Sequence, residues 1–258
     1  MKIISLGLGI QSTAMYLMSS LNHIDRADYA IFADPGAELP DTYELWDYLV
    51  DWAKHNNGIP LIKKRRSLYD DIINSKEDPN IRVASIPAFT ESEGMVRRQC
   101  TAEYKINTVV QEVRRLHGLK KYQRMKPTIM YLGISTDEIQ RVKTSSLYNI
   151  TYEYPLIDRR ITRGECIRFL EERSFHNVKK SSCTFCPYHS NRQWKEIKQN
   201  YPDEWEMVVA VDEAIRDKSK KGMKDKLYLH RSLKPIKEAY LQEDQEELFM
   251  CEEGHCGI

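Results

Sequence analysis

Cysteines are the residues of this chain with the clearest chemical potential, and there are six, at positions 100, 166, 183, 186, 251 and 256. Cys183 and Cys186 form a C-x-x-C pair, a spacing at which two thiolates can hold one zinc ion or one iron of a cluster. Cys100 follows Arg97 and Arg98 and precedes a predicted helix, so nearby cations and a helix N-terminus are expected to lower its pKa. Clustered cysteines in a reducing compartment indicate metal or redox chemistry rather than structural disulfides.

A second candidate site is the segment 7–13, which reads Gly-Leu-Gly-Ile-Gln-Ser-Thr. Glycines between a strand and a helix allow backbone N–H groups to close on an anion, and the helix N-terminus adds a partial positive charge. Ser12 and Thr13 can donate hydroxyl hydrogen bonds to phosphate oxygens. The segment is not a Walker loop, because no Gly-Lys-Ser/Thr follows. It is also a poor dinucleotide fingerprint, because Ser12 takes the place of the third glycine.

Alternating strands and helices must position these residues. Apolar runs predict strands at residues 3–8, 29–33, 59–63 and 128–132, with helices at 12–21, from about 41, at 102–117 and at 204–216. Capping boxes at Asp41/Glu44 and Thr162/Glu165 predict two helix starts, whereas residues 67–99 lack a period and are expected to form a long functional loop. This order predicts an α/β fold, an open parallel sheet with helices on both faces, in a nucleotide-binding domain at 1–160. A smaller helical region is expected at 161–258. There Cys166, within one turn of Phe169, is predicted to be an inert core residue.

The segment after the second strand adds a motif, Asp34-Pro35-Gly36-Ala37-Glu38-Leu39-Pro40-Asp41-Thr42. Together with the glycine loop it resembles the PP-loop superfamily, the adenine nucleotide alpha-hydrolase-like proteins. The most similar branch is the phosphoadenosine phosphosulfate (PAPS) reductase-like group. Two further segments fit this resemblance: residues 133–138 with Arg141, and the Tyr-Pro-Leu-Ile-Asp run at 154–158. The similarity extends from about residue 3 to residue 190.

The resemblance implies a site for ATP or PAPS, which Mg²⁺ could accompany. A departure from the family lies at Gln11, where the usual loop has an acidic residue, so metal-assisted cleavage of ATP is less well supported than nucleotide binding. The residues that the resemblance assigns to the nucleotide are Gly7, Gly9, Gln11, Ser12, Thr13, Asp34, Gly36, Glu38, Gly133, Asp137 and Arg141.

The cysteines also resemble a layout from this family. In the adenylylsulfate reductase branch, a cysteine before a lysine-bearing helix and a later C-x-x-C ligate a four-iron four-sulfur cluster, and Cys100, Cys183 and Cys186 match that order. One ligand is missing, which leaves an open iron or a ligand from the tail such as Cys251, and zinc is the alternative metal. The ending Cys256-Gly257-Ile258 resembles the mobile terminus that carries the reductases' nucleophilic cysteine, so Cys256 is the predicted catalytic residue.

These observations favour a PAPS reductase-like enzyme that carries out cysteine- or iron–sulfur-dependent sulfur chemistry, an oxidoreductase. One alternative is an ATP-dependent sulfurtransferase acting on a nucleobase of tRNA or DNA, and another is a zinc-containing nucleotide- or nucleic-acid-binding accessory protein. Expected partners are a nucleic-acid or small-molecule sulfur acceptor, a thiol reductant or sulfur donor protein, and a second copy in a homodimer. With 41% hydrophobic and 30% charged residues and a net charge of +1, the chain is expected to be cytoplasmic, without a membrane segment or a global attraction to nucleic acid.

Overall fold

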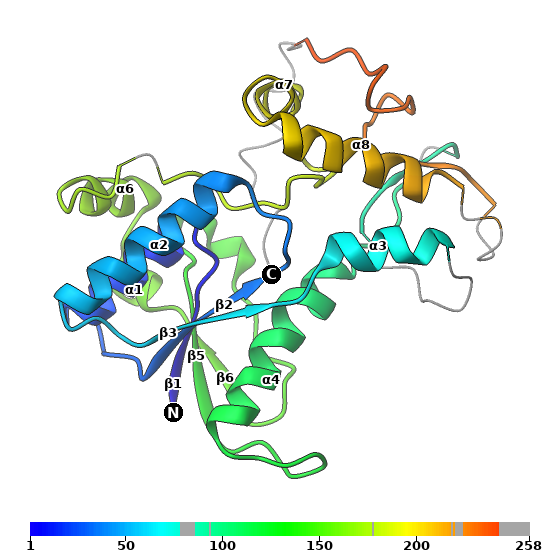
Figure 1. Ribbon diagram of the computed structural model, residues 1–258. Helices are drawn as coiled ribbons and strands as arrows, with labels where there is room; N and C mark the ends of the chain where they lie inside the picture. Colours follow the sequence, from blue (N-terminus) through cyan, green and yellow to red (C-terminus); the bar gives the residue numbers. More distant parts are fainter. Residues whose placement is uncertain (78–85, 93, 177, 218, 220–223, 243–258) are drawn as a thin grey trace. The chain divides into compact units, whose positions relative to one another are not determined.

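A computed structural model describes residues 1–77, 86–92, 94–176, 178–217, 219 and 224–242 of the protein (Figure 1). The chain divides into two compact units, each described separately below. The first, which we call the sheet unit, comprises Met1–Asp34, Pro40–Arg65 and Ile106–Ser181. The second, the cysteine unit, comprises Pro35–Leu39, Arg66–Lys105 and Ser182–Ile258.

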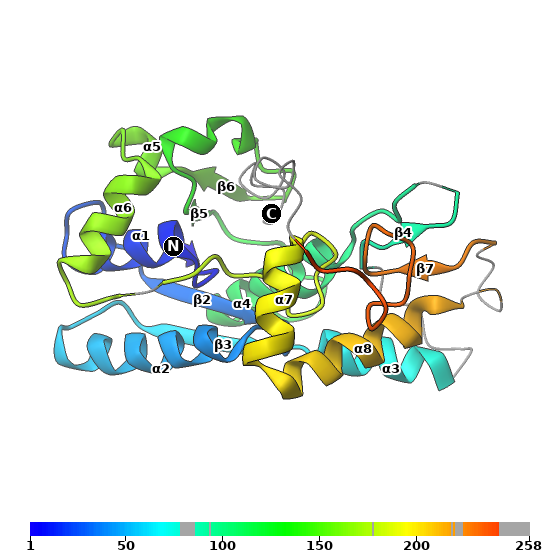
Figure 2. The same cartoon turned by 90° about the horizontal axis from the view of Figure 1, so that it is seen from above.

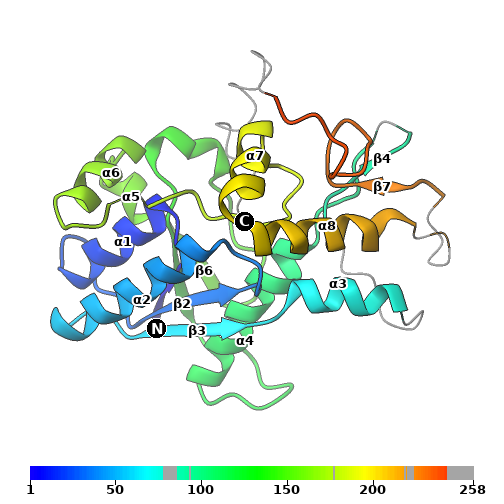
Figure 3. The same cartoon turned by 45° about the horizontal axis from the view of Figure 1, so that its top comes forward.

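The sheet unit is built on five parallel strands in the order β3-β2-β1-β5-β6 (Figure 1). Helices α1 and α6 pack against each other, while α4 packs on β2 and β3. Because the chain moves outward from β1 to β3 and then crosses back to β5, right-handed connections place α1 and α2 on one face and α4 on the other (Figure 3). The predicted α/β class with a parallel sheet is confirmed. The strands are β1 Lys2–Ser5, β2 Tyr29–Asp34, β3 Leu61–Arg65, β5 Thr128–Leu132 and β6 Ile150–Glu153, and the helices are α1 Ile10–Ser20, α2 Pro40–His55, α4 Asn107–Leu116, α5 Pro155–Asp158 and α6 Arg163–Glu171.

The direction of the strand order reverses at β1, the central strand of this sheet. Successive strands leave β1 towards β2 on one side, whereas β5 pairs with β1 on the other, with Ser5 opposite Leu132 at their carboxyl ends. In open α/β sheets, ligands bind outside the carboxyl ends of the strands at such a switch point. The loops that follow β1 and β5 are therefore the segments of this unit best placed to form a site.

Local sequence signals explain several of these elements. The predicted capping box at Thr162 is present: its hydroxyl accepts from the backbone N–H of Glu165 at 3.2 Å, and the Glu165 carboxylate accepts from the N–H of Thr162 at 2.8 Å. A helix does begin near Asp41, as predicted, but the assignment of Asp41 as its N-cap is wrong, because α2 begins at Pro40 and Asp41 lies within its first turn. An acidic residue there still favours the helix through its dipole.

The cysteine unit contains a helix where the sequence predicts part of a long functional loop. Residues 68–77 form α3, in which Leu68 and Ile72 are buried and pack against α8. The first turn of α3 contains two acidic residues, Asp70 and Asp71. The apolar residues of this stretch are few, and their burial depends on contact with a helix more than a hundred residues later. The prediction of a long loop at 67–99 is therefore wrong for these ten residues.

The described part of the cysteine unit contains the helices α3, α7 and α8 and one pair of two-residue strands, β4 and β7, that are distant in the sequence (Figure 2). Helices α3 and α7 pack on α8, and the core includes the fully buried Phe185 and Trp194. A buried carboxylate, Asp212, accepts hydrogen bonds from the backbone N–H groups of Leu229 at 2.9 Å and Ile236 at 3.0 Å, which ties the following segment to α8. The bounds are α3 Leu68–Glu77, α7 Asn191–Asn200, α8 Pro202–Arg216, β4 Phe89–Thr90 and β7 Leu227–Tyr228, with β4 and β7 antiparallel.

The two units divide the chain differently from the boundary expected at residue 160. Helix α6 belongs to the sheet unit because it packs on α1, while residues 66–105 join the C-terminal segment in the cysteine unit. Two short helical turns complete the elements: the π-helix η1 Thr101–Ile106, which leads into α4, and the 3-10 helix η2 Thr136–Arg141. Within the described part of the chain, no helix combines the length and apolar character required to cross a membrane.

Candidate functional site

The loop between β1 and α1 has a backbone conformation that allows a ligand to approach closely. Leu8 adopts the left-handed conformation, with φ of 56°, although it is not a glycine, and its side chain is buried. A non-glycine residue held there costs about 1–3 kcal/mol, and such strain tends to occur at functional sites. Gly9 then caps α1, whose first turn contains no acidic residue, and the Ser12 hydroxyl lies 3.2 Å from both the N and the O of Gly9. The positive end of the α1 dipole is thus not offset by a carboxylate of its own first turn.

Gly133, at the end of β5, packs directly on this helix start. A Cβ atom at Gly133 would lie 2.8 Å from both the N and the Cα of Ser12, and 3.1 Å from the carbonyl carbon of Gln11. These are backbone atoms, which cannot rotate away. Only glycine therefore allows the segment after β5 to lie against the first turn of α1.

We expect Gly133→Ala to destabilise the sheet unit by about 1–3 kcal/mol, because overpacking against a fixed backbone forces the two loops apart. Urea denaturation followed by circular dichroism measures the effect. The matched control is Gly164→Ala in α6, where the nearest atom to a new Cβ lies at 4.0 Å and belongs to a side chain. Equal midpoints for Gly133→Ala and the wild type would contradict the packing role.

A hydrogen bond from Gln11 to the Glu138–Arg141 ion pair joins the two loops. The side-chain amide of Gln11 donates to one carboxylate oxygen of Glu138 at 3.0 Å, and Arg141 donates to the other at 2.7 Å. Both charged side chains are largely buried, with 20% of Arg141 and 18% of Glu138 exposed. The Gln11 side chain in the first loop therefore contacts a carboxylate that belongs to the segment after β5.

Glu138 was not among the predicted site residues, whereas its neighbour Asp137 was. The carboxylate of Asp137 accepts from the backbone N–H of Arg163 at 3.0 Å, so it caps the N-terminus of α6. The signal that could have found Glu138 is its spacing of three residues from Arg141, which places both on one side of a helical turn.

Other predicted nucleotide residues have different surroundings. The Thr13 side chain is fully buried, so its hydroxyl is not exposed to a ligand in the loop, while Ser12 stays partly exposed. Asp34 is buried at the end of β2 and accepts a hydrogen bond from the hydroxyl of Tyr43 at 2.9 Å. Gly36 has φ of 68°, which explains the need for glycine, and it belongs with Glu38 to the cysteine unit.

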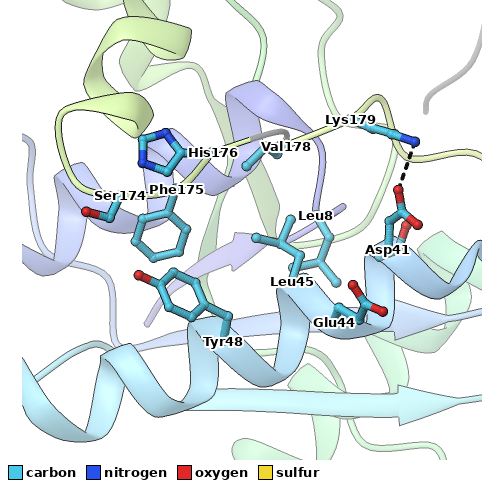
Figure 4. Close-up of a pocket in the computed structure, with 11 residues that line it drawn as sticks. Leu8, Asp41, Glu44, Leu45, Tyr48, Ser174, Phe175, His176, Val178 and Lys179 are labelled. Atoms are coloured by element: carbon cyan, nitrogen blue, oxygen red, sulfur yellow. Dashed lines mark ion pairs between the residues drawn. The ribbon is translucent and has the colours of Figure 1, made fainter.

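A pocket of about 450 Å³ lies beside the loop between β1 and α1 in the sheet unit (Figure 4). Leu8 belongs to this loop and also lines the pocket. The rings of Tyr48 and Phe175 meet edge to face, with their centroids 4.8 Å apart. Asp41 and Lys179 form an ion pair of 2.9 Å at one end of the pocket. The complete lining consists of Leu8, Asp41, Thr42, Glu44, Leu45, Tyr48, Ser174, Phe175, His176, Val178 and Lys179.

The charges of this pocket limit what it can hold. Two carboxylates, Asp41 and Glu44, lie near Lys179, which is already paired with Asp41, so a phosphate group would meet net negative charge. The ring surfaces and the aliphatic side chains suit a flat, uncharged group. The pocket therefore fits a nucleobase better than a phosphate.

The C-x-x-C pair lies on a tight turn in the cysteine unit. The backbone N–H of Cys186 donates to the carbonyl of Cys183 at 2.9 Å, and His189 lies with its Nε2 2.9 Å from the same carbonyl oxygen. The intervening Thr184 is fully buried, and its N–H donates to the carbonyl of Ala37 at 2.7 Å. Both cysteines are partly exposed on this fixed backbone.

Glu38 pairs with a lysine beside these cysteines. Its side chain is completely buried, and its carboxylate lies 3.2 Å from the Nζ of Lys105, which is 37% exposed. Burial alone would lower the pKa of Lys105, but the negative charge of Glu38 and, when ionised, of Cys183 and Cys186 raises it well above its usual range. Lys105 therefore carries a positive charge next to Cys183 and Cys186.

The expected activation of Cys100 is reversed. Burial raises the pKa of its thiol, and this effect outweighs the lowering by Arg98 and Lys105. Cys166 is buried in the core of the sheet unit, as predicted, and burial raises its pKa to about 12. Cys251 and Cys256 lie outside the described residues. Within the described segments, no three His, Cys, Asp or Glu side chains are grouped to hold a metal, so the iron–sulfur and zinc assignments stay predictions.

Neither a family model nor a curated protein sequence matches this chain. The functional conclusion consequently depends on the chemistry of the two sites themselves.

Proposed function

We propose that this chain is a PP-loop enzyme that binds an adenine nucleotide and carries out PAPS reductase-like chemistry on sulfur with its cysteines. The main support is the meeting of the loops that follow β1 and β5 at the switch point of the sheet. Gly133 brings these loops into backbone contact, and the Gln11–Glu138–Arg141 chain joins their side chains. A helix N-terminus and a positioned arginine at that point form an anion site.

The charges at this site favour a nucleotide that reacts without an obligatory metal ion. Glu138 is neutralised by Arg141, and Gln11 is uncharged, so no unneutralised carboxylate of these three is available to Mg²⁺. The helix dipole and the partly exposed Ser12 hydroxyl instead favour phosphate oxygens. In this proposal the phosphates lie on residues 7–12 with Arg141, and the adenine base enters the pocket that shares Leu8.

Tyr48→Ala tests the position of the base. Loss of the ring should weaken binding of adenine nucleotides about two- to tenfold, while affinity for inorganic pyrophosphate stays the same, because only the base contacts this wall. Competition dialysis measures both ligands. The control is Tyr148→Ala, which removes a tyrosine of the same unit that is 62% exposed. An equal loss for base-containing and base-free ligands would place the base elsewhere.

The proposed sulfur step uses Cys256. Its thiolate attacks the sulfur of the PAPS sulfate group, a sulfur–sulfur bond forms, and the sulfur–oxygen bond to the phosphate breaks with 3′,5′-ADP as the leaving group. A thiol reductant then attacks the Cys256 sulfur, which releases sulfite and leaves a mixed disulfide. A second reductant thiol restores the Cys256 thiol and forms a disulfide of the reductant.

Sulfite release from PAPS in the presence of dithiothreitol tests this function. We expect sulfite and 3′,5′-ADP in equal amounts, without a requirement for Mg²⁺. Binding of PAPS with no sulfite formed would contradict the reductase assignment while leaving the nucleotide site intact.

One observation supports the alternative function, an ATP-dependent sulfurtransferase. The Glu138 carboxylate lies 3.0 Å from the Gln11 amide, so the acidic group missing from the loop sequence is present nearby. If Arg141 turned towards the nucleotide, that carboxylate could bind Mg²⁺ and support adenylation by ATP. Conversion of ATP to AMP that depends on a sulfur acceptor, with no turnover of PAPS, would favour this candidate.

A further inference from the structure

The turn that carries Cys183 and Cys186 places the two residues within bridging range. The hydrogen bond from the Cys186 N–H to the Cys183 carbonyl closes a four-residue turn, and such turns hold their first and last Cα atoms within about 7 Å. An intramolecular disulfide requires a Cα separation of about 4.4–6.8 Å. Both cysteines are partly exposed and lie in the same unit, so an external reagent can reach them.

The surroundings of the turn hold a cation in place. Cys183 forms a backbone bridge with Glu38, whose buried carboxylate holds the Lys105 ammonium at 3.2 Å. Lys105 is thus paired with the residue that Cys183 bridges, in the same unit as both cysteines. A cation beside a dithiol stabilises the thiolate through which disulfide exchange proceeds.

We propose that Cys183 and Cys186 form a dithiol centre that alternates between two thiols and one intramolecular disulfide, with Lys105 as its cation and Glu38 as the counter-charge that partly offsets this cation. The proposal assigns a redox role to a pair for which the sequence predicts metal binding. The dithiol centre requires neither the nucleotide nor Cys256, so its test is independent of the proposed function.

The exchange balances with a small disulfide such as oxidised glutathione. One cysteine thiolate attacks a glutathione sulfur, forms a mixed disulfide and expels one glutathione thiolate. The other cysteine then loses its proton and attacks the first cysteine's sulfur, which expels the second glutathione thiolate. The cysteine pair is oxidised by two electrons, the glutathione disulfide is reduced to two thiols, and both cysteine protons end on glutathione.

The tryptic peptide of residues 181–192 reads SSCTFCPYHSNR and contains only these two cysteines, which makes the centre directly measurable. The full chain is equilibrated without oxygen in glutathione buffers of increasing oxidation, quenched with acid and labelled with a maleimide. We expect the peptide to change from two labels to none in one step, with the unlabelled form two hydrogens lighter.

Two variants give opposite expected shifts. Lys105→Met should move the glutathione equilibrium about three- to tenfold towards the disulfide, because the thiolate of the reduced form loses its cation. Glu38→Gln should move it towards the dithiol, because Lys105 then acts on the thiols without a counter-charge. Lys237→Met, which removes an exposed ion pair with Glu213 on α8, should leave the equilibrium unchanged.

Three results would overturn the proposal. The peptide could keep both labels in every buffer, or the purified protein could contain stoichiometric iron or zinc that Cys183→Ala removes. A shift of the Lys105 and Glu38 variants in the same direction would show a general loosening of the turn rather than an electrostatic role for the pair.

Discussion

Replacement of Cys256 with serine should lower the release of sulfite from PAPS by about a thousandfold or more, to the rate without enzyme. The hydroxyl of serine is a far weaker nucleophile towards sulfur than a thiolate, and the hypothesised intermediate cannot form without that thiolate. Nucleotide affinity should stay unchanged, because the proposed phosphate and base contacts belong to the sheet unit.

The assay compares single-turnover sulfite formation in the wild type, Cys256→Ser and Cys166→Ala. Cys166 is buried in the core of the sheet unit, so its replacement removes a thiol without removing a reactive one. Full activity of Cys256→Ser would contradict the assignment of the nucleophile. If sulfite formation is instead lost with Cys183 or Cys186, the attacking thiol belongs to the C-x-x-C pair.

Replacement of Arg141 with methionine should weaken the binding of adenine nucleotides by about 10- to 100-fold. A hydrogen bond to a charged group contributes about 1.5–3 kcal/mol, and the variant also leaves Glu138 without its counter-charge beside the phosphates. Glu138→Gln should have the opposite effect or none, because it removes a negative charge and releases Arg141. Calorimetric titration with 3′,5′-ADP measures both variants.

The matched control for Arg141 is Arg168→Met, which removes an exposed arginine from α6 in the same unit. It should bind the nucleotide as the wild type does, since a general change of net charge has little effect at physiological salt. Equal affinity of Arg141→Met and the wild type would show that Arg141 serves only to hold Glu138 and Gln11.

The sequence predicted the elements whose signals are local. The strand at 128–132 and the capping box at Thr162 were found from short patterns, and they agree with β5 and α6. The glycine loop after the first strand was also placed correctly between β1 and α1. These features depend on residues within a few positions of one another, which is what periodicity and capping rules describe.

Features formed by distant residues could not be predicted in this way. Glu38 was assigned to the nucleotide because of its motif, but its buried carboxylate pairs with Lys105, 67 residues later. The helix α3 was missed because its apolar residues are buried only by contact with α8. The expected low pKa of Cys100 failed because neighbouring charges in the sequence say nothing about burial, which is the larger effect.

The most direct test of the central claim is a titration of the wild-type chain with adenine nucleotides in the presence of EDTA. The proposed function predicts one site per chain for PAPS, competition by 3′,5′-ADP, and no need for a divalent cation. The absence of binding for PAPS, 3′,5′-ADP and ATP at millimolar concentration, with and without Mg²⁺, would contradict it.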